Sequence, residues 1–293
     1  MINDLNVASL ALYTPFRFEK PPLIESNTSS EATKISAIVF ISIALYNSLE
    51  LLILITLGFK RYRSLYFWAL LASTVLGVIP TSIGTLLQFF NLAPISSTFT
   101  FAIIGFYFMV PGQSIVLYSR LYLVSQNDKL LRFLRYMIIV DTIILLIPTT
   151  VLNAGWAFIR MPAWIQGYDV IEKVQLTWFC VQETFISSIY IIETSKLIRT
   201  SPEGDKRRNK ILYELIAINL TAILMDISLL VLEYVGLYFT QVILKALVYS
   251  IKLKLEFAVL GMLVSIASHA GDSGPTCYVE AETTTSNVSN VAS

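Results

Sequence analysis

The chain has 293 residues, of which 55% are hydrophobic and 14% charged, with a mean hydropathy of +0.68 and a net charge of +1. Soluble domains carry about 25% charged residues, so this composition excludes an ordinary soluble domain. The near-zero net charge gives no reason to expect a nucleic-acid partner. We therefore expect an all-α membrane protein, because lipid offers no partner for the backbone N–H and C=O groups of open strands.

The two ends of the chain are polar. Residues 1–34 form a head that we expect outside the membrane domain, and it does not resemble a signal peptide. Within it, Asn27 opens an Asn-Thr-Ser sequence and is a candidate glycosylation site. Residues 268–293 are rich in Ser, Thr and Asn, so we expect a disordered tail.

Between these ends, residues 35–267 contain seven apolar runs, each long enough to cross a bilayer as a helix. The runs are Ile35–Gly58, Leu65–Phe90, Ser97–Val124, Phe133–Phe158, Lys173–Ile198, Lys210–Phe239 and Gln241–Ala267. Little more than Thr240 separates the last two, but together they are too long for one span. The sequence therefore predicts a polytopic bundle of seven transmembrane helices.

Lysine and arginine divide unequally between the two sides of this bundle. Thirteen lie in or near the loops after the first, third and fifth spans, and five lie on the other side. Cytoplasmic loops carry the excess of basic residues, so the N-terminus is predicted outside and the C-terminus in the cytoplasm. The densest run forms a predicted loop before the sixth span, where we expect anionic lipid or a cytoplasmic protein partner. This basic run is Lys206, Arg207, Arg208 and Lys210.

The second and third spans contain prolines and a candidate lock. Pro80 and Pro111 predict kinks in these two spans. Small residues around Gly77 predict close packing of the second span against a neighbour. Arg120 closes the third span at the predicted cytoplasmic edge. We interpret it either as a marker of the membrane interface or as a lock to an acid of the sixth span, with Glu214 at the matching depth.

The seventh span holds Lys252, Lys254 and Glu256 within five residues. A charge at bilayer depth costs roughly 2.5–3.5 kcal/mol on insertion scales, so these residues need a reason to be there. Each helical residue turns about 100°, which points the two lysines roughly 200° apart. Either protein surrounds this helix on both sides, or one lysine extends along the helix to place its charge at the membrane surface. We expect the first, a central and enclosed helix. We also expect Glu50 to pair with one lysine and Asp226 with the other.

Polar residues inside the membrane are candidates for a ligand or switch cavity. The candidates are Asn47, Glu50, Gln113, Glu183, Asp226, Lys252, Lys254 and Glu256. A structural interpretation is equally open, in which the same side chains only fix how the helices pack. The two interpretations are compatible, because polar contacts that fix the helix packing can also break when the protein changes conformation.

The sequence gives little support for a catalytic activity. His269 is the single histidine, which excludes a three-histidine zinc site, an HExxH metalloprotease and a Ser-His dyad. No glycine-rich phosphate loop occurs. A retinal protein with Lys252 or Lys254 as the Schiff base is disfavoured, since the third span has no carboxylate to act as a counterion. We expect no enzyme, no metal and no cofactor.

Four motifs carry a resemblance to a known family. They are ALYNSLELLILI in the first span, RYRSLYFWALLAS at the second, GQSIVLYSRLYLV in the third and YSIKLKLEFAVLG in the seventh. Their order resembles a fungal family of seven-span membrane proteins that is catalogued as a domain of unknown function. The resemblance implies the fold and the membrane location, and no ligand. The chain is also loosely similar to seven-helix receptors. It lacks the cysteine pair and the acid-Arg-aromatic triplet that are typical of those receptors.

Three functions remain open on the sequence. The first is a receptor-like sensor of an unknown ligand, with the polar residues as its cavity and the basic run as its cytoplasmic output. The second is a channel or transporter that uses the same buried charges, and the third is a structural membrane protein without a ligand. We expect the plasma membrane as the location in preference to an internal membrane. A path lined by Glu50, Lys252 and Asp226 would favour transport.

Overall fold

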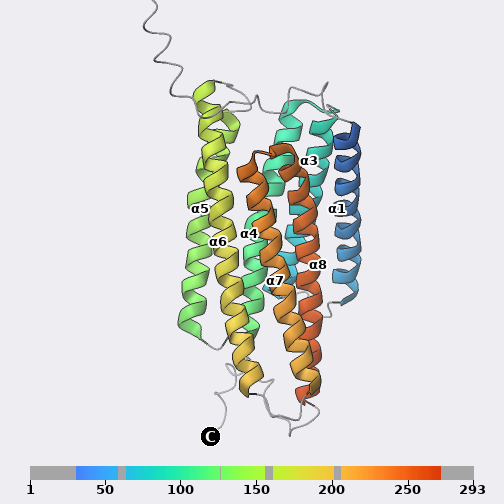
Figure 1. The fold of residues 1–293 in the computed structure, drawn as a ribbon, viewed down its shortest axis with the longest axis vertical. Helices are drawn as coiled ribbons and strands as arrows, with labels where there is room; N and C mark the ends of the chain where they lie inside the picture. Colours follow the sequence, from blue (N-terminus) through green and yellow to red (C-terminus); the bar gives the residue numbers. More distant parts are fainter. Residues whose placement is uncertain are drawn as a thin grey trace, which may run out of the picture.

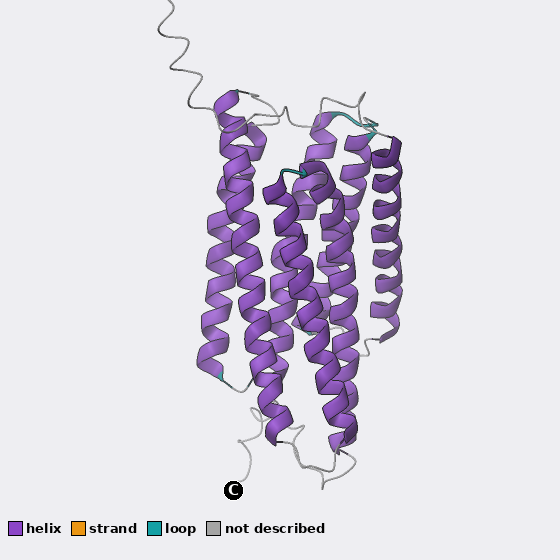
Figure 2. Cartoon of the chain, in the orientation of Figure 1, coloured by secondary structure: helices purple, strands orange, loops and turns teal. Residues whose placement is uncertain are grey.

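The structure, a computed structural model, describes residues 31–58, 64–90, 92–125, 127–155, 161–200 and 206–271. Within these residues all regular secondary structure is helical, and short loops join the helices (Figure 2). The helices are α1 (Glu31–Gly58), α2 (Leu65–Ala72), η1 (Ser73–Val78), α3 (Ile79–Phe89), α4 (Ile95–Val124), α5 (Asp128–Ala154), α6 (Pro162–Thr200), α7 (Lys206–Val235) and α8 (Tyr238–Gly271). Because α2, η1 and α3 are continuous, the described chain forms seven rods that run up and down in one bundle (Figure 1).

Each predicted span corresponds to one rod, with shifted ends. Four stretches are long and apolar enough to cross a membrane, and they lie in α1, in the α2–η1–α3 rod, in α4 and in α7. Large apolar side chains face outward on these rods, among them Leu57 at 79% and Trp68 at 58% exposure. A soluble protein rarely exposes such continuous apolar surface, so the outer face of the bundle is suited to lipid. The chain is a helical membrane protein.

The second rod changes its helical form where the sequence predicts a kink. Residues 73–78 form a π-helix, and Pro80 follows in the first turn of α3. Proline lacks an N–H and crowds the carbonyl four residues earlier, so the wider π turn absorbs the mismatch. Thr74 Oγ1 donates at 2.8 Å to the carbonyl of Leu70 in the last turn of α2. That carbonyl also accepts from the Ser73 N–H, so it has two donors where the π-helix begins.

The α4 rod lies among four others, and so does the seventh span (α8), which contacts α1, the α2–η1–α3 rod, α4 and α7; this agrees with the expected central place of α8. The α4 rod contacts α2, η1 and α3 on one side, α5 and α6 on another, and α8 as well. Glycine makes the first contact close: a Cβ built on Gly105 would lie 2.7 Å from the backbone nitrogen of Thr81, and one built on Gly77 would lie 2.9 Å from the backbone of Met109. The predicted close packing at Gly77 is therefore confirmed, with α4 as its partner.

A tight turn separates α7 from α8 and moves the predicted boundary. The apolar pattern extends the sixth span to Phe239, but α7 ends at Val235. Gly236 follows with φ at +82°, a conformation that only glycine adopts freely. The N–H of Leu237 donates to the carbonyl of Leu232 at 3.2 Å and caps the helix. This turn lets α7 and α8 pack as antiparallel neighbours (Figure 1).

Candidate functional site: buried ion pairs between the helices

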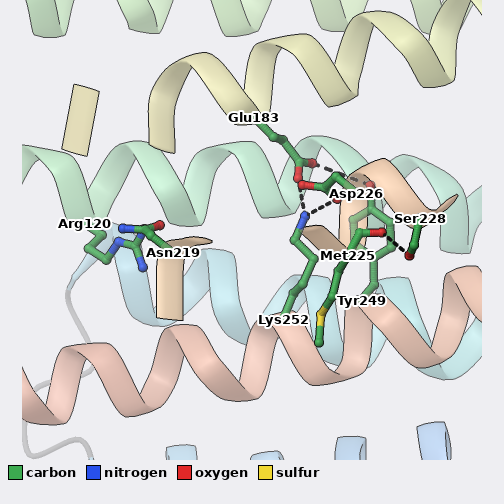
Figure 3. A network of polar contacts seen from close by, with 8 residues as sticks. All are labelled: Arg120, Glu183, Asn219, Met225, Asp226, Ser228, Tyr249 and Lys252. Carbon is green, nitrogen blue, oxygen red and sulfur yellow. Dashed lines mark hydrogen bonds and ion pairs between the residues drawn. The ribbon is translucent and has the colours of Figure 1, made fainter. Parts of the chain in front are cut away.

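Lys252 of α8 is the centre of a buried triad of charged residues (Figure 3). Its Nζ lies 2.7 Å from Asp226 Oδ1 of α7 and also contacts Glu183 Oε2 of α6. The side chains of Lys252, Asp226 and Glu183 are 1%, 8% and 2% exposed. Three helices therefore meet at one ammonium group, and removing any member would change the charge balance of a buried site.

Tyr249 completes the polar surroundings of this triad. Its hydroxyl donates to Glu183 Oε1 at 3.5 Å, and its ring centre lies 5.1 Å from Lys252 Nζ. Tyr249 precedes Lys252 by one helical turn, so both side chains occupy the same face of α8. The ring and the ammonium are close enough for a cation–π contact.

A second buried pair lies along the same face of α8, toward its C-terminal end. Arg120 of α4 places Nη1 2.8 Å from Glu256 Oε2 of α8, and its Nη2 donates to Asn219 Oδ1 of α7. The guanidinium carbon lies 4.2 Å from the centre of the Tyr190 ring of α6. Arg120 and Glu256 are each 1% exposed. A single arginine of α4 therefore contacts three other helices.

The partner of Arg120 differs from the one predicted by depth. Glu214, the predicted acid, has a side chain 46% exposed and lies 4.0 Å from Lys210. The partner is Glu256, whose backbone carbonyl also accepts a hydrogen bond from the Tyr66 hydroxyl at 2.7 Å. Depth alone could not distinguish these acids, because the rotation of each helix decides which of its residues faces α4.

Near the opposite end of α8, Lys245 forms a third charged cluster. Its Nζ lies 3.9 Å from Glu172 Oε1 of α6 and 5.6 Å from the ring centre of Phe106 in α4. Glu233 of α7 is 4% exposed in the same half of the bundle. Helical spacing places Lys245 on the face of α8 that holds Lys252, although Lys245 is not one of the predicted cavity residues.

Some buried amides have no hydrogen-bond partner among the described residues. The side-chain nitrogen and oxygen of Gln113 in α4 and of Gln182 in α6 are both unpaired, and the two residues are 0% and 3% exposed. A buried polar group without a partner costs roughly 1–3 kcal/mol. These amides are therefore groups that a changed helix arrangement or a bound molecule would satisfy.

Lys254 lies on a different face of α8 and pairs with α1. Its Nζ is 2.6 Å from Glu50 Oε2, and the side chains are 36% and 35% exposed. This confirms the predicted pairing of one lysine with Glu50 and, through Lys252, of the other with Asp226. The expected enclosure on both sides is wrong for Lys254, because its ion pair lies at the outer surface between α1 and α8. Asn47 is buried close by and donates to Ser250 Oγ at 3.4 Å.

The eight cavity candidates consequently do not share one place. Glu183, Asp226 and Lys252 form the triad, and Glu256 belongs to the Arg120 contact. Gln113 is buried on α4, whereas Asn47, Glu50 and Lys254 belong to the α1–α8 contact.

Four members of the first two buried contacts are not among these candidates: Arg120, Tyr190, Asn219 and Tyr249. The signal for Arg120 is its position in an apolar run, which leaves its charge dependent on a partner. Tyr190 carries a weaker signal, since it lies on the polar stripe of α6 three residues after Ser187 and seven after Glu183.

The basic run and the glycosylation site were also predicted from the sequence. The predicted loop from Lys206 to Lys210 is the first turn of α7, so these residues are on a helix. Lys210 has a side chain 78% exposed. Asn27 lies outside the described residues.

An open hollow adjoins the basic run on the first turns of α7. It is lined by Asn209, Lys210, Tyr213, Glu214 and Ala217. The hollow and the exposed lysine lie at the end of the bundle where the sequence predicts the cytoplasm. This end therefore combines a basic helical turn with a shallow, mostly apolar hollow on the surface of the same helix.

Comparisons with known proteins identify the family of this chain. No curated protein and no solved structure matches the chain. One family model matches residues 25–276, which include every described residue. The family is described as a domain of unknown function, so membership implies no ligand and no activity. The resemblance of the four motifs likewise implies none. Because the match covers most of its length, the chain belongs to the family described as Domain of unknown function (DUF7703).

Proposed function

We propose that this chain is a receptor-like seven-helix membrane protein in which buried ionic contacts hold the closed state of a conformational switch. In this proposal all seven rods cross the membrane, with the N-terminus outside and the C-terminus in the cytoplasm. The observation that carries the proposal is the position of Arg120. It lies on α4, is 1% exposed, and contacts α6, α7 and α8 through Tyr190, Asn219 and Glu256.

Such a contact is suited to a switch because it is either made or broken. A guanidinium group holds its donors in a rigid fork, so a rotation or shift of α7 or α8 would separate Arg120 from its partners. Leaving one partner of a buried ion pair without the other costs roughly 3–5 kcal/mol, so an arrangement that breaks this contact is populated only when another interaction offsets that cost. A ligand would shift the balance between them by its difference in affinity for the two.

The proposed output is the end of the bundle that carries the basic run. Lys210 is exposed on the first turns of α7, next to the open hollow that includes Tyr213 and Ala217. Movement of α7 would change the position of these groups relative to the rest of the bundle. We propose anionic lipid and a cytoplasmic protein as the partners of this end, and no nucleic acid.

A distance measurement between helices tests the switch. Spin labels are attached at Tyr122 of α4 and Tyr213 of α7, which are 61% and 62% exposed. The background carries Cys180→Ala and Cys277→Ser. We expect one narrow distance distribution in the otherwise unchanged protein, and a broader one with longer distances in Arg120→Met.

The matched control for this measurement is Arg132→Met. It removes an exposed arginine of α5 and should leave the distance distribution unchanged. If Arg120→Met also leaves the distribution unchanged, Arg120 does not hold the helices together.

Transport is a second candidate, favoured by a polar stripe along α8. Gln241, Lys245, Tyr249, Lys252 and Glu256 share one face of the helix and are all buried. Glu50 pairs with Lys254 outside this stripe, so of the three residues whose shared path would favour transport, Lys252 and its partner Asp226 lie along the stripe. Purified protein in vesicles with an internal pH-sensitive dye tests the candidate. Flux that depends on Lys252 would favour transport over a receptor.

The remaining parts of the proposal concern origin and location. The four motifs support a fungal origin, and the span count, the N-out orientation and the basic run before the sixth span support a likeness to seven-helix receptors. The basic asymmetry supports the orientation, and the outer polar head with its glycosylation sequence supports the plasma membrane. We propose no enzymatic activity.

A further inference from the structure

The charges of the buried triad do not balance. Lys252 brings one positive charge, whereas Glu183 and Asp226 bring two carboxylates. The neighbouring ion pairs of α8 are matched one to one: Arg120 with Glu256, and Lys254 with Glu50. With both of its carboxylates ionised, the triad would hold one net negative charge in a site that is almost completely closed to solvent.

The geometry makes this excess charge costly. Both carboxylates contact the same ammonium nitrogen, which brings their oxygens close to each other. Like charges at this range in a buried site are not both retained, because one ammonium offsets only one of them. Two carboxyl groups that lie this close can hold one proton between them.

The charged and titratable groups around the triad do not remove the imbalance. On α6 the neighbouring group is the Cys180 thiol, on α8 it is the Tyr249 hydroxyl, and both are neutral when protonated. Glu256 of α8 is the next acid along the same face, and its charge is matched by Arg120 of α4. No further lysine or arginine among the described residues contacts Glu183 or Asp226 through an ion pair.

We propose that the Glu183–Lys252–Asp226 triad is a proton-binding site, in which the two carboxylates share one proton beside the charged lysine. The ligand of this site is a proton. Its uptake or release would change the net charge of the contact that joins α6, α7 and α8. The site does not depend on the proposed function, since it would serve a receptor and a transporter equally.

Infrared spectroscopy of the purified full-length protein in lipid tests the site at neutral pH. A protonated carboxyl group has a C=O stretching band that is separate from the carboxylate bands and shifts in heavy water. Difference spectra between the unchanged protein and each variant remove the contributions of other acids. The variants Glu183→Gln and Asp226→Asn keep the size of the side chain and remove one acid each.

The expected pattern is specific to a shared proton. Each single variant leaves one lysine and one carboxylate, which balance, so each should lose the signal of one protonated carboxyl. Lys252→Met removes the cation and should increase the triad signal about twofold, because both acids are then protonated. Glu50→Gln, which removes an acid matched one to one with Lys254, is the control and should lose none of this signal.

Each outcome of the infrared experiment either supports or overturns the proton-binding site. Loss of the band in both single variants, with no loss in the control, supports the site. A band that persists in either single variant would overturn it, and so would the absence of any triad band in the unchanged protein. If Lys252→Met does not fold, the two single variants still decide the question. Failure of the distance measurement on Arg120 would leave this result unaffected, because the two experiments report on different residues.

Discussion

Lys252 and Lys254 stand two residues apart on α8, yet the first side chain is 1% exposed and the second 36% exposed. Because successive helical residues turn about 100°, the two ammonium groups leave the helix on different faces. Lys252 faces the interior and meets Glu183 and Asp226, while Lys254 faces the outer surface and meets Glu50. A single turn of one helix therefore takes part in two separate ionic contacts.

The Glu50–Lys254 pair should stabilise the contact of α1 with α8. We expect Glu50→Gln and Lys254→Met each to lower the free energy of unfolding by roughly 3 kcal/mol, because each leaves a charge beside lipid without its partner. The double variant should recover most of that loss. Unfolding of the four proteins in detergent, followed by intrinsic fluorescence, gives the coupling energy. Additive losses would mean that the two residues do not interact.

Close packing of α3 against α4 should depend on Gly105. A Cβ at this position would lie 2.7 Å from the Thr81 nitrogen and 2.9 Å from the Gly77 oxygen, so Gly105→Ala must push the helices apart. We expect a loss of roughly 1–3 kcal/mol in thermal unfolding. Gly261→Ala is the control, since nothing lies within 4 Å of its Cβ. It should raise stability by up to about 1 kcal/mol through helix propensity. Equal effects of the two changes would contradict the packing argument.

Arg120 should not be replaceable by lysine. A lysine ammonium is a compact charge and cannot reach Asn219 and Glu256 in the fork geometry that the guanidinium uses. We expect Arg120→Lys to lower the free energy of unfolding by roughly 2 kcal/mol, the cost of an unpaired buried group. Arg132→Lys, at an exposed position of α5, should change it by less than about 0.5 kcal/mol. A stable Arg120→Lys variant would show that one contact is sufficient.

The orientation of the bundle can be read from two exposed positions at opposite ends. In a background without Cys180 and Cys277, single cysteines replace Leu92, between α3 and α4, and Lys129, at the start of α5. The basic asymmetry predicts Leu92 outside and Lys129 inside. A membrane-impermeant maleimide added to intact cells should label the cysteine at 92, and should label the cysteine at 129 only after the membrane is opened. The reverse pattern would invert the topology.

The basic run at the start of α7 should attract anionic lipid. Each base near an anionic surface contributes about 1 kcal/mol, so replacing all four with glutamine should reduce the anionic lipid that remains bound. The four are Lys206, Arg207, Arg208 and Lys210. Mass spectrometry of the protein purified in mild detergent measures the bound lipid. Lys173→Gln, on α6 at the predicted outer end, is the control and should leave the bound lipid unchanged. If the fourfold variant keeps the same amount of bound anionic lipid and the same thermal stability, the basic run does not bind this lipid.

The sequence alone determined the class of the protein and the place of each rod. Long apolar runs predict membrane helices because the chain must satisfy its backbone groups internally in lipid, and this property is local. It also determined that Glu50 and Asp226 would be needed as counter-charges, because a buried lysine without one is too costly. Local sequence also predicted the irregularity of the helix near Pro80. It did not predict that the irregular segment is a π-helix.

Only the tertiary structure decided which residues meet. It paired Arg120 with Glu256 instead of Glu214, added Glu183 to the contact between Lys252 and Asp226, and turned Lys254 outward. These outcomes depend on the rotation of each rod about its own axis and on its choice of neighbours. Both follow from how all the rods pack together, with contacts such as Gly105 against Thr81 setting how closely the helices approach. A single span contains no information about the faces that the other rods present to it.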